Sequence, residues 1–139
     1  MNRIELVTLK DPYRFYDWMT AHPQRIPFLM DVMFTMRQQY PDTELIFSLD
    51  PSDDDVVFVE PYGFAEPYQF RVSDYHAIKE TLQFYQSDAS YRNFIRRYRN
   101  WRHQFRAWWD SYRDYIKRLE QLVPKDECGR VLHQERKIQ

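Results

Sequence analysis

The chain has 139 residues, enough for one domain, and a formal net charge of −1. Its mean hydropathy of −0.79 argues against a membrane protein, and the longest strongly apolar run, residues 28–36, is too short to span a bilayer and contains Asp31. Only two glycines are present, Gly63 and Gly129, so a P-loop and a dinucleotide-binding fingerprint are both excluded.

The first forty residues predict a short strand and two helices. Residues 4–9 could form the strand. Asp11 followed by Pro12 is typical of a helix start, which predicts a helix near 11–21. A second helix near 27–40 is apolar nearly all round, so we expect it at the centre of the core.

The middle of the chain predicts strands. Three apolar or alternating stretches lie between residues 44 and 72, and turn residues such as Pro51 and Gly63 separate them. This pattern is typical of an antiparallel β-meander of three or four strands. A third helix is expected near 74–86.

One long amphipathic helix is predicted from Tyr91 to Leu122, because this stretch contains neither Gly nor Pro and Pro124 follows it. Its apolar residues recur at alternating steps of three and four, an unbroken heptad pattern. They are Tyr91, Phe94, Tyr98, Trp101, Phe105, Trp108, Tyr112, Tyr115, Leu119 and Leu122. We therefore expect an α+β fold over residues 1–124, with this helix packed on the rest, and a polar, frayed tail at 125–139.

The length of this helix predicts self-association. Its 32 residues would span about 48 Å, whereas a compact chain of this size is roughly 37 Å across. The C-terminal end should overhang, and its apolar side chains would then need a partner such as a second copy in a homodimer. The predicted self-association seam consists of Tyr112, Tyr115, Ile116, Leu119 and Leu122.

Charge is separated along the chain. Residues 41–90 carry eleven acids and two bases, and residues 91–118 carry nine bases and two acids. Eight of these bases form the predicted Arg ridge: Arg92, Arg96, Arg97, Arg99, Arg102, Arg106, Arg113 and Lys117. Three interpretations stay open: a solvated surface, an acidic protein partner (which includes the chain's own middle), or nucleic acid.

No catalytic, cofactor-binding or metal-binding residue is predicted. Four acids lie close together in one turn, but without the spacing or the glycine of a calcium loop, so an ordinary acidic turn is favoured. The histidines show no zinc-ligand spacing, and the lone cysteine has no nearby base. The residues concerned are Asp50, Asp53, Asp54, Asp55, His22, His76, His103, His133 and Cys128.

These patterns predict a non-enzymatic protein–protein interaction module, a small regulator, adaptor or inhibitor, that acts through the long helix and self-associates. The alternative is a nucleic-acid-binding protein that uses the Arg ridge. A single cysteine allows no internal disulfide, and the N-terminus lacks the apolar stretch of a signal peptide. We therefore expect a cytoplasmic protein without a membrane partner.

Overall fold

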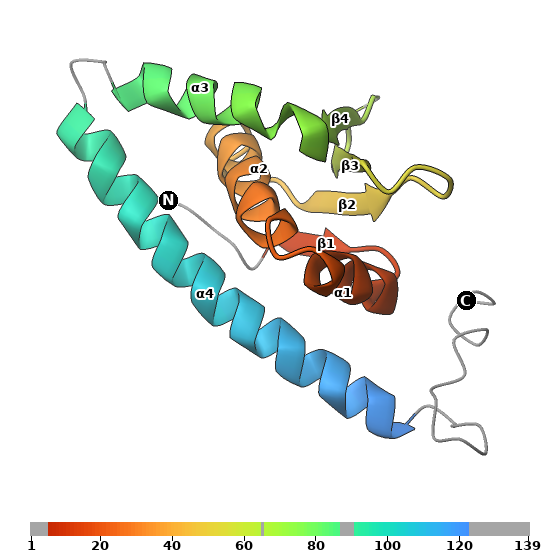
Figure 1. Ribbon diagram of the computed structural model, residues 1–139. Coiled ribbons are helices and arrows are strands. Elements are labelled where there is room, and N and C mark those ends of the chain that lie inside the picture. The colour runs from red at the N-terminus through yellow and green to blue at the C-terminus, as the bar shows by residue number, and fades with distance from the viewer. Residues whose placement is uncertain (1–5, 65, 87–90, 123–139) are drawn as a thin grey trace.

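A sheet covered on one side by helices is the framework of the computed structural model, which describes residues 6–64, 66–86 and 91–122 (Figure 1). The elements are, in chain order, β1 (Val7–Leu9), α1 (Pro12–Ala21), α2 (Arg25–Gln39), β2 (Leu45–Leu49), β3 (Val56–Pro61), β4 (Tyr68–Arg71), the 3-10 turn η1 (Val72–Asp74), α3 (Tyr75–Gln86) and α4 (Tyr91–Leu122). The predicted α+β class and the long helix are confirmed. The predicted tail at 125–139 lies outside the described residues.

The sheet is mixed, with strand order β1-β2-β3-β4. The predicted antiparallel meander is confirmed for β2, β3 and β4. The prediction of a wholly antiparallel sheet is wrong for β1, which pairs parallel to β2 with Val7 opposite Leu45. The reason is the connection: α1 and α2 carry the chain back to the start of the sheet, and such a helical crossover permits parallel pairing.

Alternation along the strands directs one face of the sheet toward the helices. In β2, Leu45, Phe47 and Leu49 are buried, while Ile46 and Ser48 between them are only partly buried. Their cross-strand partners in β3 on the helical side are buried as well. One face of the sheet therefore supplies the core.

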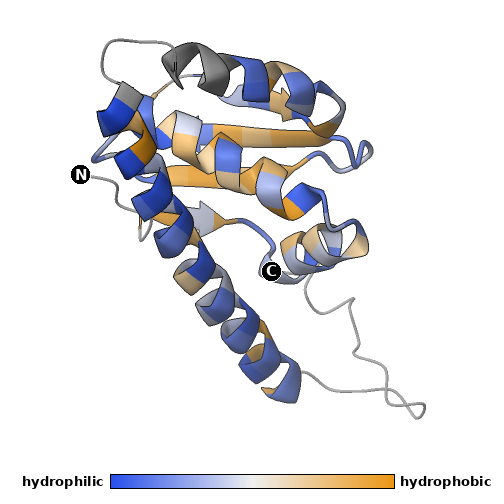
Figure 2. Ribbon diagram, turned by 60° about the vertical axis from the view of Figure 1, so that its left-hand side comes forward, coloured by the Kyte–Doolittle hydropathy of each residue, from blue (hydrophilic) through white to orange (hydrophobic). Residues whose placement is uncertain are grey.

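Helix α2 lies at the centre of the molecule, between the sheet and α4 (Figures 1 and 2). Its apolar side chains are buried around most of its circumference: Phe28, Leu29, Val32, Met33, Phe34 and Met36. This burial confirms the prediction of a central helix. The helix is contacted on opposite sides, which explains why its sequence is apolar nearly all round.

Helix α1 begins as its sequence predicts. The carboxylate of Asp11 accepts a hydrogen bond of 3.4 Å from the backbone N–H of Arg14, and Pro12 occupies the first helical position. Asp11 adopts a left-handed backbone conformation with φ of 53°, which acidic residues tolerate better than most.

A buried arginine fixes the turn between α2 and β2. Arg37 is almost fully buried, and its guanidinium donates to the carbonyls of Tyr40, Thr43 and Leu6 at 2.6–2.9 Å. This one side chain therefore joins the end of α2 to the segments that lead into β1 and β2.

Helix α4 crosses the other helices as an outer layer and contacts α1, α2 and α3 (Figure 1). Four of its aromatic residues are buried against the rest of the chain, as predicted: Phe94, Trp101, Phe105 and Tyr112. None of the helices in the described part of the chain combines the length and the apolarity needed to cross a membrane.

Candidate functional site

Aromatic rings attach α4 to α2 and thereby fix which side of α4 faces solvent. Phe34 of α2 contacts Phe94, Tyr98 and Trp101 of α4 edge-on or tilted, with ring centroids 5.1–5.9 Å apart. The indole N–H of Trp101 donates to the carbonyl of Met30 at 3.1 Å. Because such rings gain both buried area and favourable edge contacts, the rotation of α4 about its axis is well determined.

The C-terminal half of α4 is attached to α1. The ring of Tyr16 stacks on Trp109 at 5.9 Å and meets Tyr112 edge-on. The hydroxyl of Tyr112 donates to the carbonyl of Pro12, and burial raises the pKa of this phenol. Helix α1 therefore covers part of the surface that was expected to be free.

The predicted self-association seam is divided by this contact. Tyr112 and Ile116 are buried within the chain, so the prediction that they meet a second copy is wrong for these two residues. Leu119 is half-buried, whereas Tyr115 is 41% exposed and Leu122 is 81% exposed. The overhang therefore begins later in the helix than chain length alone suggested, because α1 extends the core beneath it.

A buried carboxylate joins three helices. Asp31 of α2 is 3% exposed and accepts hydrogen bonds from Tyr75 of α3 at 2.7 Å and from Tyr98 of α4 at 2.6 Å. Burial raises the pKa of Asp31, and the two hydrogen bonds offset part of that rise. Burial and the bond to Asp31 also raise the pKa of both phenols.

The function of this cluster is structural, and two cations cover it. Lys79 lies over the ring of Tyr75 at 4.6 Å, and Arg102 lies over Tyr98 at 6.0 Å. Sequence reasoning missed the cluster. The available signal was Asp31 itself, an acid in the middle of an apolar helix.

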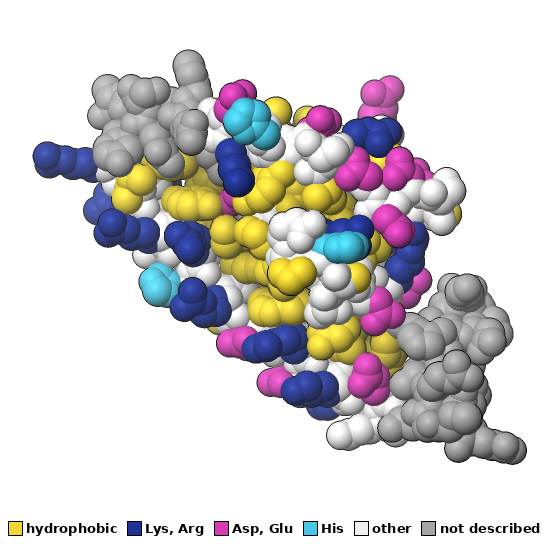
Figure 3. All heavy atoms as spheres, in the orientation of Figure 1, with side chains coloured by type: hydrophobic (Ala, Val, Ile, Leu, Met, Phe, Trp, Pro, Cys, Tyr) yellow, Lys and Arg dark blue, Asp and Glu magenta, His cyan; other side chains and the backbone are white. Residues whose placement is uncertain are grey.

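The Arg ridge faces away from the core. Seven of its residues are exposed, Arg92, Arg96, Arg99, Arg102, Arg106, Arg113 and Lys117, while Arg97 is partly buried and donates to Gln38 at 2.8 Å. Arg113 forms an ion pair with Asp110, on the same helix. Basic side chains follow α4 along one edge of the face drawn in Figure 3, while acidic side chains gather mostly over the strand loops.

In the described part of the chain, no ion pair joins the acidic segment 41–90 to the Arg ridge. Hydrophobic side chains form a band beside the ridge (Figure 3). Apart from Arg113, which pairs with Asp110, the exposed residues of the ridge therefore present a row of positive charge toward solvent.

An apolar groove lies where the ridge meets α2. We call it the α2–α4 groove; it has a volume of about 220 Å³ and is lined by Ile26, Pro27, Met30, Arg102, Phe105, Arg106 and Trp109. This volume is below the roughly 300–1,000 Å³ of typical small-molecule sites. The groove is therefore sized for one or two side chains of a partner, with two arginines beside them.

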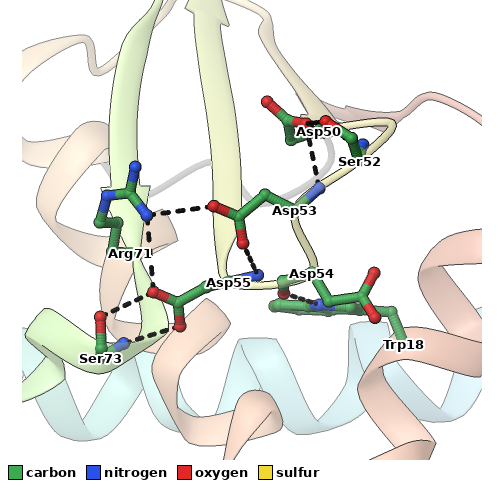
Figure 4. A network of polar contacts seen from close by, with 8 residues as sticks. All are labelled: Trp18, Asp50, Ser52, Asp53, Asp54, Asp55, Arg71 and Ser73. Atoms are coloured by element: carbon green, nitrogen blue, oxygen red, sulfur yellow. Dashed lines mark hydrogen bonds and ion pairs between the residues drawn. The ribbon is translucent and has the colours of Figure 1, made fainter.

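The acidic turn between β2 and β3 is closed by its own hydrogen bonds (Figure 4). Asp50 accepts from the backbone N–H groups of Ser52 and Asp53 at 2.9 and 3.1 Å, and the bond from Ser52 lowers its pKa. Asp55 accepts from the N–H and hydroxyl of Ser73 at 3.0 and 2.6 Å.

Other groups of this turn form ion pairs or hydrogen bonds as well. Arg71 lies 3.2 Å from Asp53 and 3.8 Å from Asp55, and the backbone carbonyl of Asp54 accepts from Trp18 at 2.7 Å (Figure 4). No cluster of three or more metal-ligating side chains occurs in the described part of the chain. The turn is a structural link between the sheet, α1 and η1.

The histidines and the cysteine are dispersed. His22, His76 and His103 are exposed, and His76 pairs with Glu80 at 2.9 Å on the same helix. His133 and Cys128 lie outside the described residues.

Comparison with known proteins gives no relative from which a function could be carried over. No protein-family model matches the chain, and no curated protein or solved structure matches it. Charge, groove geometry and exposed side chains are therefore the basis for assigning a function.

Proposed function

We propose that the chain is a non-enzymatic protein–protein interaction module that binds an acidic protein segment along the Arg ridge and in the α2–α4 groove. The observation that carries this proposal is the combination of exposed arginines, unpaired with the acidic segment in the described residues, and an apolar hollow between two of them.

The residue types around the groove support a protein partner. Arg, Met and aromatic residues are enriched at the centres of protein interfaces, and Met30, Phe105 and Trp109 line the groove beside Arg102 and Arg106. An apolar anchor in such a hollow supplies affinity, and the surrounding charges supply speed and selectivity of association. The expected ligand is therefore a segment with an apolar side chain flanked by Glu or Asp.

Nucleic acid is the second candidate, because residues 89–109 contain no acid and Arg suits phosphate. Non-specific single-strand binding also needs aromatic faces on which bases stack. Trp109 and Trp108 are instead stacked on Tyr16 and Tyr112. We therefore favour the protein ligand, and we place the interaction in the cytoplasm on the basis of the single cysteine.

Fluorescence anisotropy with three probes tests the proposal. The probes are a labelled peptide of Glu and Phe, an all-Glu peptide of equal charge, and duplex DNA. The wild type should bind the Glu–Phe peptide most tightly. Arg102→Glu with Arg106→Glu should weaken that binding by at least about tenfold, because it replaces two attractive charges beside the groove with two repulsive ones.

Lys10→Glu with Arg118→Glu is the matched control, because both residues are exposed, lie outside the groove and change the net charge equally. The control should bind the peptide nearly as the wild type does. Stronger binding to DNA, with a log–log salt slope near about −3 to −4 for four phosphate contacts, would instead support nucleic acid. Absence of binding to all three probes would refute both functions.

A further inference from the structure

A group of aromatic side chains is exposed at the turn between β3 and β4. Tyr62 is 70% exposed, Phe64 is 50% exposed, and Tyr68 is also exposed. Large aromatic residues usually lie inside a protein of this kind, and exposed apolar groups of this type mark interaction sites. We call residues 60–68 the aromatic turn; Ala65 within it lies outside the described residues.

Residues 61–64 of the aromatic turn form a hydrogen-bonded β-turn. The N–H of Phe64 donates to the carbonyl of Pro61 at 3.1 Å, and Gly63 supplies the positive φ of 87° at the third position, as a type II turn requires. The N–H of Tyr62 donates to the carbonyl of Glu44 at 2.9 Å. A turn that is already ordered loses little entropy when it binds.

Tyr40, at the end of α2, supports the turn from below. Its ring centroid lies 4.9 Å from that of Phe64, and its hydroxyl lies 2.7 Å from that of Tyr68. The turn is therefore attached to the C-terminal end of α2. The α2–α4 groove, in contrast, is lined by Ile26, Pro27 and Met30 from the N-terminal end of the same helix.

This arrangement prevents the turn from reaching the groove of its own chain. Residues 26 and 40 are 14 positions apart on one helix and its cap, a distance of roughly 20 Å at 1.5 Å per residue. Helix α2 is largely buried in the core and holds the two surfaces apart. Any contact between the turn and the groove must join two molecules.

The turn and the groove are complementary in chemistry. Glu60 and Glu66 are exposed on either side of the aromatic residues, and the turn contains no basic residue. The groove offers an apolar hollow with Arg102 and Arg106 beside it. The turn is thus an acidic segment with apolar anchors, the class of ligand proposed above.

We propose that the partner is a second copy of this chain, whose aromatic turn docks in the α2–α4 groove with Phe64 or Tyr62 as the anchor and Glu60 or Glu66 beside the arginines. This inference rests on the proposed function and names its ligand. It also accounts for a chain of net charge −1 that keeps its acidic and basic segments apart. Two copies related by a two-fold axis would each supply one turn and one groove.

Sedimentation velocity from about 1 to 200 μM, spanning the micromolar range of moderate affinities, tests this contact with two variants. The groove variant is Arg102→Glu with Arg106→Glu, and the turn variant is Phe64→Ser with Glu66→Lys. The wild type should associate, and each variant alone should shift the midpoint by at least about tenfold. All four residues are exposed, but Arg102 also lies over Tyr98 in the Asp31 cluster. Circular dichroism and thermal unfolding therefore check the fold of the groove variant, and Arg106→Glu alone repeats the test without changing that cluster.

Mixing the two variants gives the decisive result. Each variant retains the half of the contact that the other lacks, so an equimolar mixture should associate more strongly than either variant alone. Lys10→Glu with Arg118→Glu should associate as the wild type does. A mixture that stays monomeric, or variants that associate like the wild type, would overturn the proposal.

The seam offers a competing interface, which the same assay resolves. Tyr115→Glu with Leu122→Glu changes only exposed residues of the predicted self-association seam. If this variant alone abolishes association, the contact lies at the end of α4 and the turn-to-groove proposal is wrong. A wild type that stays monomeric but still binds the Glu–Phe peptide would refute the second copy while leaving the proposed function intact.

Discussion

The hydroxyl of Tyr98 donates a 2.6 Å hydrogen bond to the carboxylate of Asp31, a residue 67 positions earlier in the chain. Because Asp31 is buried, removing this donor leaves a carboxylate oxygen poorly satisfied. We expect Tyr98→Phe to lower the free energy of unfolding by about 1–3 kcal/mol. Tyr115→Phe, on an exposed side of the same helix, should change it by less than about 0.5 kcal/mol. Equal effects of both substitutions in urea unfolding would show that the bond contributes nothing.

The burial of Asp31 also predicts a dependence of stability on pH. Its pKa is raised in the folded state, so the folded chain binds this proton more tightly than the unfolded chain, whose Asp pKa is about 3.9. The contribution of Asp31 to stability is therefore fully present below the unfolded pKa and is lost as pH rises through the folded pKa. In Asp31→Asn this loss should be absent. The difference in unfolding free energy between the variant and the wild type should thus move in favour of the variant as pH rises from about 3 to 7; a constant difference would contradict the raised pKa.

Arg37 should be among the residues least tolerant of substitution. Its guanidinium donates to three carbonyls from two segments, and it is almost fully buried. Arg37→Met keeps much of the volume but removes the donors, so we expect a loss of about 2–3 kcal/mol. Arg96→Met, which removes an exposed arginine of α4, serves as the control and should be nearly neutral. Thermal unfolding of the two variants side by side measures the difference.

The local elements were predictable from sequence because their signals are local. Asp11 with Pro12 marks the start of α1, and the apolar heptad from Tyr91 to Leu122 gives α4 its bounds as found. The parallel pairing of β1 was not predictable in this way, because no turn residue links it to β2. Strand pairing across two helices depends on how the whole chain packs.

Buried polar residues were the main omission. Arg37 looks like an ordinary surface residue of a helix, and Asp31 stands out only as an acid in an apolar helix, until α3, α4 and the β1 segment pack around them. The groove was missed for the same reason, since Met30 and Phe105 come together only in the folded chain. The use of the Arg ridge as an interface stays a prediction.

The acidic turn should not bind calcium, although it contains four aspartates. Asp50, Asp53 and Asp55 accept hydrogen bonds from backbone or hydroxyl groups of the turn and of η1. A cation would have to displace these bonds, so millimolar calcium or zinc should leave the melting temperature unchanged. A rise of several degrees with calcium would show that the turn can open to form a site.

Asp55 should matter for stability instead. Its two bonds to Ser73 join the residue before β3 to η1, the turn between β4 and α3. We expect Asp55→Ala to cost about 0.5–2 kcal/mol, the range measured for lost helix caps. Asp54→Ala keeps the backbone carbonyl that accepts from Trp18, so it should be close to neutral. Chemical denaturation of both variants measures whether the Asp55 side chain stabilises the fold.

Because α4 covers α2, the order in which the two helices are synthesised decides how long the apolar surface of α2 stays exposed. Helix α2 is complete at Gln39, but its cover begins only at Tyr91, 52 residues later. At roughly 5–20 residues per second, this gap lasts about 3–10 s. During that interval the emerging chain carries Phe34 and Met30 in water on a surface that nothing yet protects. A nascent chain halted before α4 should therefore recruit chaperones, and one that has released α4 should not.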